Sequence, residues 1–356
     1  MRTRRQRSSS DPVPRSGHRS VLLHESLESL AIEPNDIVVD ATLGGAGHAK
    51  EIVKRLGANG IFVGIDADRD AIERAEVALK SSLAQVISLR SQTAQSAEGV
   101  GEPHSVLRGG EQRAPRALRT DGSQKKTGPT VFLVHGNFRD IESHLGKHGI
   151  QHITKALFDL GWSGFQLAAG RGFSFTEDGP LYMTYADAIT PKTLTAERIV
   201  NTWGEESIAD VIYGWGEERY SRQIARGIVE ARQKKPIQSP RELAEIIAYS
   251  VPAFYRRGRI HPATKTFQAL RIAVNDEMGA LKQGLASVWK MLQPNGRLAV
   301  ISFHSVEDRD VKRFMLEKAQ TGEAERMTKS PIRPSREEVL ANPRSRSAKL
   351  RVIRKL

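Results

Sequence analysis

The stretch IVVDATLGGAGH, residues 37–48, decides the fold of this chain. Its first residues are β-branched and apolar and end on Asp40, a pattern that predicts a short buried strand. Three glycines follow within four residues, and glycine lets a backbone approach a ligand closely. Residues 49–56 then repeat apolar side chains at helical spacing, so a glycine-rich loop is predicted to join a strand to a helix.

The same alternation continues outward along the chain. IFVGID, residues 61–66, predicts a second strand that ends on an acid, and residues 70–83 predict the next helix. Further strands are expected at 131–134, 156–159, 298–303 and 350–353, with a turn at 294–296. Strands that alternate with helices predict an α/β fold, here a Rossmann-like parallel sheet covered by helices.

A long block without strand signals interrupts this pattern. Residues 190–255 favour helices at 199–211, 222–232 and 241–250, which predicts a helical subdomain inserted in the sheet domain. One long amphipathic helix is predicted over 266–289. The expected division is a basic disordered tail (1–17), a first part of the sheet domain (18–163) with a flexible insertion (91–130), a mostly helical substrate-recognition insert (164–258), and a second part of the sheet domain with a basic C-terminal segment (259–356).

Composition narrows the function. The chain of 356 residues has a net charge of +13, and the excess lies at its ends: residues 1–20 hold six arginines and one acid, and residues 321–356 hold ten Lys or Arg and four Glu. Basic ends favour a polyanionic partner, nucleic acid first. With no cysteine, disulfides, iron–sulfur clusters, cysteine-ligated zinc and a cysteine nucleophile are excluded.

Composition also guides the expected location. No apolar run approaches the ~18 residues of a membrane-spanning helix, so we expect a soluble, cytoplasmic protein without a membrane partner. The Arg- and Ser-rich, acid-poor start is also similar to a transit peptide, which keeps an organelle matrix as a minor alternative.

The glycine-rich loop and Asp66 together predict a nucleotide-like cofactor. Asp66 lies 22 residues after Gly44, and a carboxylate at this place can accept both ribose hydroxyls of a dinucleotide or of S-adenosylmethionine. A dinucleotide fingerprint needs a small residue where this chain has Lys50. The spacing therefore favours a methyltransferase over a dehydrogenase, and a ligand-free tight turn is the least favoured interpretation.

Many further motifs carry a resemblance. They are HRSVLL (18–23), DATLGGAGH (40–48), GID (64–66), HGNF (135–138), DLG (159–161), RGFSF (171–175), DGPL (178–181), GEER (216–219), HPATKTFQALR (261–271), SFHSVEDR (302–309) and NPRSRSAKLR (342–351). In this order the chain resembles the bacterial 16S rRNA (cytosine-N4)-methyltransferases, the RsmH or MraW family, from about residue 18 to 356 outside 91–130.

The resemblance implies an activity, a cofactor and a partner. It implies transfer of a methyl group from S-adenosyl-L-methionine to the N4 exocyclic amine of one cytidine in the decoding region of small-subunit ribosomal RNA, with the helical insert recognising the RNA. A homodimer is kept as an option. By the family pattern, the cofactor contacts are Ala46, Gly47, His48, Asp66, Phe138, Asp159 and Gln166.

Two strand-end residues are candidates for catalysis. The amine must lose a proton, and Asp159 is the first choice for its acceptor, with cofactor binding alone as an equal alternative. His304 could relay a proton or contact RNA, although a hydrogen-bonded structural role is more usual for such a histidine. Ser305 and Asp308 could form a helix capping box, and Glu307 could pair with Arg309.

Basic and aromatic side chains are the candidates for RNA contact. Lys265, Arg271 and Arg309, with the basic run 344–355, could bind phosphates. Bases could stack on Trp162, Phe165 and Phe173, for which core packing is the equal alternative. The histidines His144, His148 and His152 recur every four residues, but glycines interrupt them, so a surface run is expected and no metal site.

The chain departs from the family pattern at three places. WSGFQLA (162–168) stands where the family has VSSPQLD, YMTYA (182–186) stands where it has DMRMD, and 91–130 is inserted. These changes surround the expected cytosine pocket. Two alternatives therefore stay open: a methyltransferase acting on another RNA or on a protein, and a non-catalytic RNA-binding ribosome-assembly factor.

Overall fold

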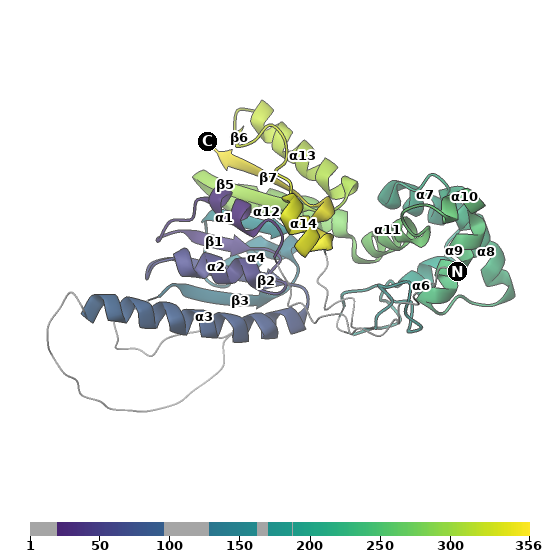
Figure 1. Ribbon diagram of the computed structural model, residues 1–356, viewed down its shortest axis with the longest axis horizontal. Coiled ribbons are helices and arrows are strands. Elements are labelled where there is room, and N and C mark those ends of the chain that lie inside the picture. Colours follow the sequence, from purple (N-terminus) through teal and green to yellow (C-terminus); the bar gives the residue numbers. More distant parts are fainter. Residues whose placement is uncertain (1–19, 96–127, 162–169, 187) are drawn as a thin grey trace, which may run out of the picture.

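A seven-stranded sheet forms the centre of the computed structural model, which describes residues 20–95, 128–161, 170–186 and 188–356, with side chains outside 84–95 (Figure 1). The order is β3-β2-β1-β4-β5-β7-β6. The first five of these strands run parallel, and β7 runs antiparallel to both neighbours. The strands are β1 (Ile37–Asp40), β2 (Ile61–Asp66), β3 (Thr130–His135), β4 (Ile153–Asp159), β5 (Leu292–Ser302), β6 (Ala324–Arg326) and β7 (Lys349–Lys355).

Helices cover both faces of the sheet, because successive strand residues point to opposite faces. Val39 and Phe158 pack in one core, with α4, α12 and α13, while Val38 and Leu157 pack in the other, with α1, α2 and α3. The bounds are α1 (Leu23–Leu30), α2 (Gly47–Arg55), α3 (Arg69–Gln95), η1 (Phe138–Asp140), α4 (Ile141–Gly146), α12 (Glu277–Met291), α13 (Ser305–Gln320), α14 (Arg336–Ala341) and η2 (Pro343–Ser347). The expected Rossmann-like α/β fold is thereby confirmed.

A separate helical lobe lies beside the sheet, at the right of Figure 1. Its helices are α6 (Ala196–Thr202), α7 (Glu205–Gly216), α8 (Ser221–Lys234), α9 (Pro240–Ser250), α10 (Ala253–Arg256) and α11 (Ala263–Asn275). They share a third hydrophobic core, which runs from Phe173 to Leu270. This core passes the expected boundary at 258, since α11 packs with the insert.

The single helix predicted over 266–289 is wrong. The chain forms α11 and α12, separated by Asp276 in the left-handed region with φ 47°. The apolar face is continuous in sequence, but Phe267 and Leu270 pack in the insert core whereas Leu281 and Leu285 pack against the sheet. One straight helix could not pack against both the insert core and the sheet core, and the break at Asp276 changes the direction of the chain between them.

Smaller differences have similar causes. The helix predicted over 199–211 is divided into α6 and α7, because Trp203 and Gly204 are extended. The turn expected at 294–296 lies inside β5 as an irregularity, with Asn295 at φ 64°. The insertion 91–130 lies mostly outside the described residues, as does the tail 1–17. Across the described part of the chain, no helix is both long and apolar enough to cross a membrane.

Candidate active site

Three acids meet at the carboxyl edge of the sheet. Asp40 ends β1, Asp66 ends β2 and Asp159 ends β4, and these strands are parallel neighbours. The chain leaves β1 toward β2 on one side, while β4 lies on its other side. Open α/β sheets bind their ligands at such a switch point. The topology therefore places the acids where a cofactor crevice is expected.

The glycine-rich loop is shaped by Asp66. The Gly44 amide donates to Oδ2 of Asp66 at 2.8 Å, and the Asp68 amide donates to Oδ1 at 2.9 Å. Gly44 has φ +49°, where a side chain is strained. Each carboxylate oxygen can accept a second hydrogen bond, so Asp66 can hold the loop and still accept the hydroxyls of a ribose.

The loop then turns directly into α2. Ala46 lies in the left-handed region with φ 59° and precedes Gly47, the first residue of the helix. A Cβ on Gly47 would lie 1.9 Å from Oγ of Ser20, which leaves no space for a side chain. The contact brings the segment before α1 against the loop and narrows the crevice from that side.

All three acids are disfavoured as anions. Burial raises the pKa of Asp66, and burial together with the nearby Asp66 raises the pKa of Asp40 to about 7. Burial raises the pKa of Asp159 still further from its usual range, and Asp40 and Glu307 add to it. A buried cation would relieve this cost because it would compensate the negative charges.

Asp159 also has an unused acceptor. Its Oδ1 is buried and has no hydrogen-bond partner among the described residues. Oδ2 lies 3.6 Å from Nδ1 of His48, which is longer than a hydrogen bond. Nε2 of His48 lies 3.2 Å from the Val21 carbonyl oxygen, which can only accept, so Nε2 carries the proton. Nδ1 of His48 therefore faces a carboxyl group whose raised pKa favours protonation.

An aromatic ring borders the crevice on the β3 side. Phe138, the first residue of η1, meets Phe158 edge-on at 5.5 Å between ring centroids. A Cβ on Gly284 of α12 would come within 2.9 Å of the Phe138 ring. The ring is thus fixed by packing from two elements, which suits a wall for a flat cofactor base.

An open cleft of about 480 Å³ continues from Asp66 toward the insert. It is lined from the sheet side by Ala67, His135, Asn137 and Arg139, and from the insert side by Thr184, Tyr185, Ala186, Val274, Asn275 and Asp276. The cleft thus connects the carboxyl edge of the sheet with the segment 182–186, one of the places that depart from the family pattern.

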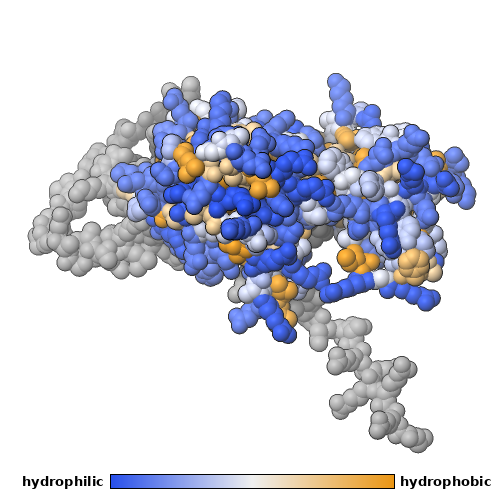
Figure 2. All heavy atoms as spheres, turned by 90° about the horizontal axis from the view of Figure 1, so that it is seen from above, coloured by the Kyte–Doolittle hydropathy of each residue, from blue (hydrophilic) through white to orange (hydrophobic). Residues whose placement is uncertain are grey.

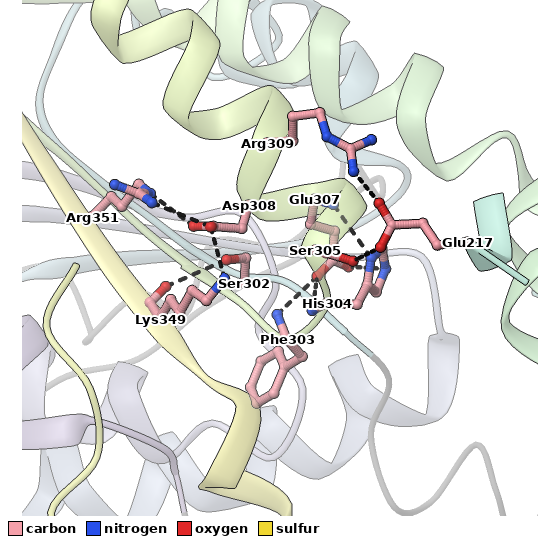
Figure 3. A network of polar contacts seen from close by, with 10 residues as sticks. All are labelled: Glu217, Ser302, Phe303, His304, Ser305, Glu307, Asp308, Arg309, Lys349 and Arg351. Carbon is pink, nitrogen blue, oxygen red and sulfur yellow. Dashed lines mark hydrogen bonds and ion pairs between the residues drawn. The ribbon is translucent and has the colours of Figure 1, made fainter. Parts of the chain in front are cut away.

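His304 and Glu307 form the helix cap at the start of α13 (Figure 3). The Glu307 amide donates to Nδ1 of His304 at 3.3 Å, and the Phe303 amide donates to Oε2 of Glu307 at 2.8 Å. Burial alone would raise the pKa of Glu307, but His304, the Phe303 amide and the charge of Arg271 outweigh it, and the pKa is lowered. His304 is thus hydrogen-bonded in a structural role, the more usual alternative for such a residue.

The capping box expected from Ser305 and Asp308 is wrong by one residue, because His304 and Glu307 form it. The expected pair of Glu307 with Arg309 is also wrong, since Arg309 pairs with Glu217. Ser305 donates to Glu217, and Asp308 accepts from Lys349 at 2.8 Å and from Arg351 at 2.7 Å (Figure 3). These long-range partners occupy the side chains that the local spacing would have used.

Glu217 joins the insert to the sheet domain. Located at the end of α7, it accepts hydrogen bonds from Ser305 and Arg309 on α13 (Figure 3). Its backbone carbonyl accepts from Nζ of Lys265 at 2.8 Å. Two of the basic residues expected to contact RNA therefore converge on Glu217.

The third, Arg271, is placed differently. It is only 7% exposed, and its Nε and Nη2 donate to Glu277 at 2.8 and 2.9 Å. The Tyr185 hydroxyl donates to the same carboxylate at 3.1 Å. Because its side chain is buried and its guanidinium is bonded to Glu277, Arg271 is poorly placed for the phosphate contact expected from the sequence. Neither Glu277 nor Tyr185 was recognised as a partner from the sequence.

Several of the remaining candidates cannot be placed at the site. Gln166, Trp162 and Phe165 lie outside the described residues, and Phe173 is buried in the insert core. His144 contacts the Asn137 carbonyl, and His148 packs on Phe132. Within the described ranges, the one group with metal-like spacing is Glu277, His304 and Glu307, whose carboxylates are already used by Arg271 and by the cap.

With this geometry in place, the comparisons with known proteins identify the family. The model of the MraW methylase family matches residues 15–105 and 112–356. The chain belongs to this family. Its match is interrupted only between 105 and 112, inside the expected insertion.

Curated members of the family are similar over nearly their whole length. Each of the following is named ribosomal RNA small subunit methyltransferase H. The protein of Koribacter versatilis is 42% identical over 342 residues, covering 95% of this chain and 94% of that one. That of Deinococcus deserti is 41% identical over 340 residues (95% and 93%), and that of Symbiobacterium thermophilum is 39% identical over 355 residues (95% and 96%). The resemblance found in the sequence is confirmed.

Asp66→Ala should abolish measurable binding of S-adenosylmethionine, a loss of at least about 100-fold, because both the ribose acceptor and the anchor of Gly44 disappear. Isothermal titration calorimetry on the folded variant checks this. Asp68→Asn, in the same turn but not bonded to the loop, is the matched control. An unchanged affinity in D66A would contradict the ribose assignment.

Asp40→Asn should alter how stability depends on pH. The folded pKa of Asp40, raised from 3.8 to about 7, means that the native state holds a proton that the unfolded state releases, so the stability of the wild type falls as pH rises from about 4 to about 7. Between pH 5 and pH 8 the variant should gain about 3 kcal/mol relative to the wild type. Urea unfolding of the cofactor-free protein measures this, with Asp70→Asn as the exposed control. Parallel pH profiles of D40N and wild type would be inconsistent with the assignment.

Proposed function

We propose that this chain transfers a methyl group from S-adenosyl-L-methionine to N4 of one cytidine in the decoding region of 16S ribosomal RNA. The observation that carries the proposal is Asp159, whose Oδ1 is buried without a hydrogen-bond partner among the described residues, placed beside the glycine-rich loop in a member of the MraW methylase family. The names of the relatives, all small-subunit ribosomal RNA methyltransferases, support the choice of substrate.

The residues of the edge fit this cofactor. Asp66 would accept the ribose hydroxyls, the loop from Gly44 to His48 would approach the donor closely, and Phe138 would face the adenine. When bound, the cofactor supplies an electrophilic methyl group on a positively charged sulfur. Burial raises the pKa values of Asp40, Asp66 and Asp159, and a positively charged ligand would compensate the negative charges of these carboxyl groups.

Asp159 has the chemistry that the cytosine amine needs. The lone pair of this amine is delocalised into the ring, so orientation and removal of the proton limit the reaction. A cation beside Asp159 lowers its affinity for a proton, and loss of that charge raises it again. Beside a bound cationic cofactor, Asp159 would therefore be a carboxylate, and it could accept the proton that the amine loses.

The RNA would enter through the cleft between the sheet edge and the insert. Lys265 and Arg309, held near each other by Glu217, would face its phosphates, and His304 would stay a positioning residue at the start of α13. The proposal includes a cytoplasmic site of action without membrane contact. A homodimer stays a prediction, which sedimentation would check.

A second candidate is a methyltransferase of the same family that acts on a different RNA. Thr184, Tyr185 and Ala186 line the cleft and belong to a stretch that departs from the family pattern. Tyr185 is tied to Glu277 and stacks on Phe173 at 5.4 Å. We expect these substitutions in the lining of the cleft to affect the choice of target RNA more than the binding of the cofactor.

The substrate can be tested directly. Incubation with radiolabelled cofactor and small subunits from cells lacking this methylation should label 16S RNA, and nucleoside mass spectrometry should show N4-methylcytidine. Subunits that already carry the modification serve as the control. Labelled RNA without N4-methylcytidine would support the second candidate instead.

Asp159→Asn should lower kcat by about 100-fold or more, because the amide keeps the volume but cannot take the proton. The Kd for S-adenosylmethionine should change by less than about tenfold. Asp140→Asn, outside the crevice, controls for a general effect of charge. If kcat stayed the same and only cofactor affinity fell, Asp159 would be a binding residue alone.

A further inference from the structure

A row of exposed arginines and aromatic rings borders the insert between α9 and α11. We name it the Arg–aromatic rim and define it as Tyr249, Phe254, Arg256, Arg257 and Arg259. Tyr249 is 79% exposed and Phe254 66%, and all three arginines are exposed. Figure 2 shows hydrophobic spots among hydrophilic side chains on the lobe formed by the insert. Single exposed aromatic side chains are common on protein surfaces, so it is the charge beside these two that points to a binding site.

The charge of the rim is uncompensated. Residues 246–275 contain no Asp or Glu. Within the described ranges, Arg256, Arg257 and Arg259 make no ion pair, whereas other exposed arginines of the insert do, such as Arg226 with Glu205 and Arg241 with Asp178. Arg256 lies over the Tyr249 ring at 5.9 Å. The rim therefore offers guanidinium groups without an acidic partner together with exposed aromatic rings.

The rim is also held in place from beneath. Between its members, Tyr255 points inward, where its hydroxyl donates to the fully buried Glu218 at 2.5 Å. Arg219 lies over the Tyr255 ring at 5.1 Å. After the turn, His261 stacks on Phe175 at 4.4 Å and 10°. The segment is anchored at both ends, so its outward side chains start from a fixed backbone.

The position of the rim relates it to the cleft. It lies just before α11, whose thirteen residues correspond to a length of about 20 Å. At the other end of α11, Asn275 lines the cleft next to the sheet edge. A nucleotide bound in the cleft is too far away to touch the rim, and a continuous RNA could reach both.

We propose that the Arg–aromatic rim binds an unpaired segment of the substrate RNA away from the methylated nucleotide, with phosphates on the arginines and bases stacked on Tyr249 and Phe254. This inference rests on the proposed function for the identity of the RNA. Unpaired RNA is the partner that uses both features, since its phosphates need cations and its exposed bases need flat faces. An acidic protein would use the arginines and leave the rings without a partner.

The charge is tested by replacing the three arginines together in the full chain, R256Q/R257Q/R259Q. Affinity for small-subunit RNA, measured against salt concentration, should fall by at least roughly tenfold at physiological salt. The slope of log K against log salt should decrease by about 2, at about 0.7 for each lost contact with single-stranded RNA. Affinity for S-adenosylmethionine should stay the same, which shows that the variant is folded.

A matched variant removes the same charge elsewhere on the insert. R222Q/R226Q/K234Q takes three positive charges from exposed positions on α8. It should leave the affinity and the slope close to wild type. Equal losses in the two triple variants, or no loss in the rim variant, would overturn the proposal.

The rings are tested separately. Y249A/F254A should weaken RNA binding by about fivefold or more with an unchanged salt slope, and Y249F/F254Y should retain wild-type affinity because a stacking face remains. Polyglutamate that competes as well as RNA of the same length would point to a protein partner and reject the proposal. All of these experiments measure binding. If the wild-type protein formed no N4-methylcytidine, the proposed function would be rejected, whereas the proposal of an RNA site at the rim would be unaffected.

Discussion

Placing three carboxyl groups at one edge of a buried sheet is the constraint on which the rest of the structure depends. Asp40, Asp66 and Asp159 end neighbouring parallel strands, so their side chains cannot avoid one another without breaking the sheet. Burial makes each anion costly, and their proximity adds to the cost. A bound ligand can reduce this cost, and a positively charged ligand would do so most effectively because it compensates the negative charges.

The elements around this edge are organised to keep it rigid and open on one side. The glycine-rich loop is fastened to Asp66, and Phe138 is fixed between β4 and α12. On the open side, the insert approaches through the cleft, with Asp276 dividing α11 from α12 so that one helix packs with the insert and the next with the sheet. The fold thus separates a fixed cofactor edge from a surface that can vary with the target.

Much of this could be predicted from the sequence, because the features concerned are local. The short apolar runs before Asp40, Asp66 and Asp159 predict buried strands, and the glycines after Asp40 favour a tight loop. What failed depended on contacts distant in the chain. Ser305 was expected to cap its own helix, but its hydroxyl donates a hydrogen bond to Glu217, 88 residues earlier in the chain. His304 is the N-cap residue instead. The partner of Arg271 could not be predicted because residues six apart do not face each other on a continuous helix. In the structure, the helix breaks at Asp276, and this break brings Glu277 within hydrogen-bond distance of Arg271.

Glu217 gives the basic surface near α13 a property that counting charges does not reveal. Its side chain neutralises Arg309, and its carbonyl holds the ammonium group of Lys265, so both cations are already engaged in the protein by itself. The Arg309 side chain is nevertheless half exposed, and only its Nη2 is engaged by Glu217, so its other N–H groups can still donate to a phosphate. The positive charge that this surface presents to a polyanion is therefore smaller than the number of its basic residues suggests, while hydrogen-bond donors remain available on it.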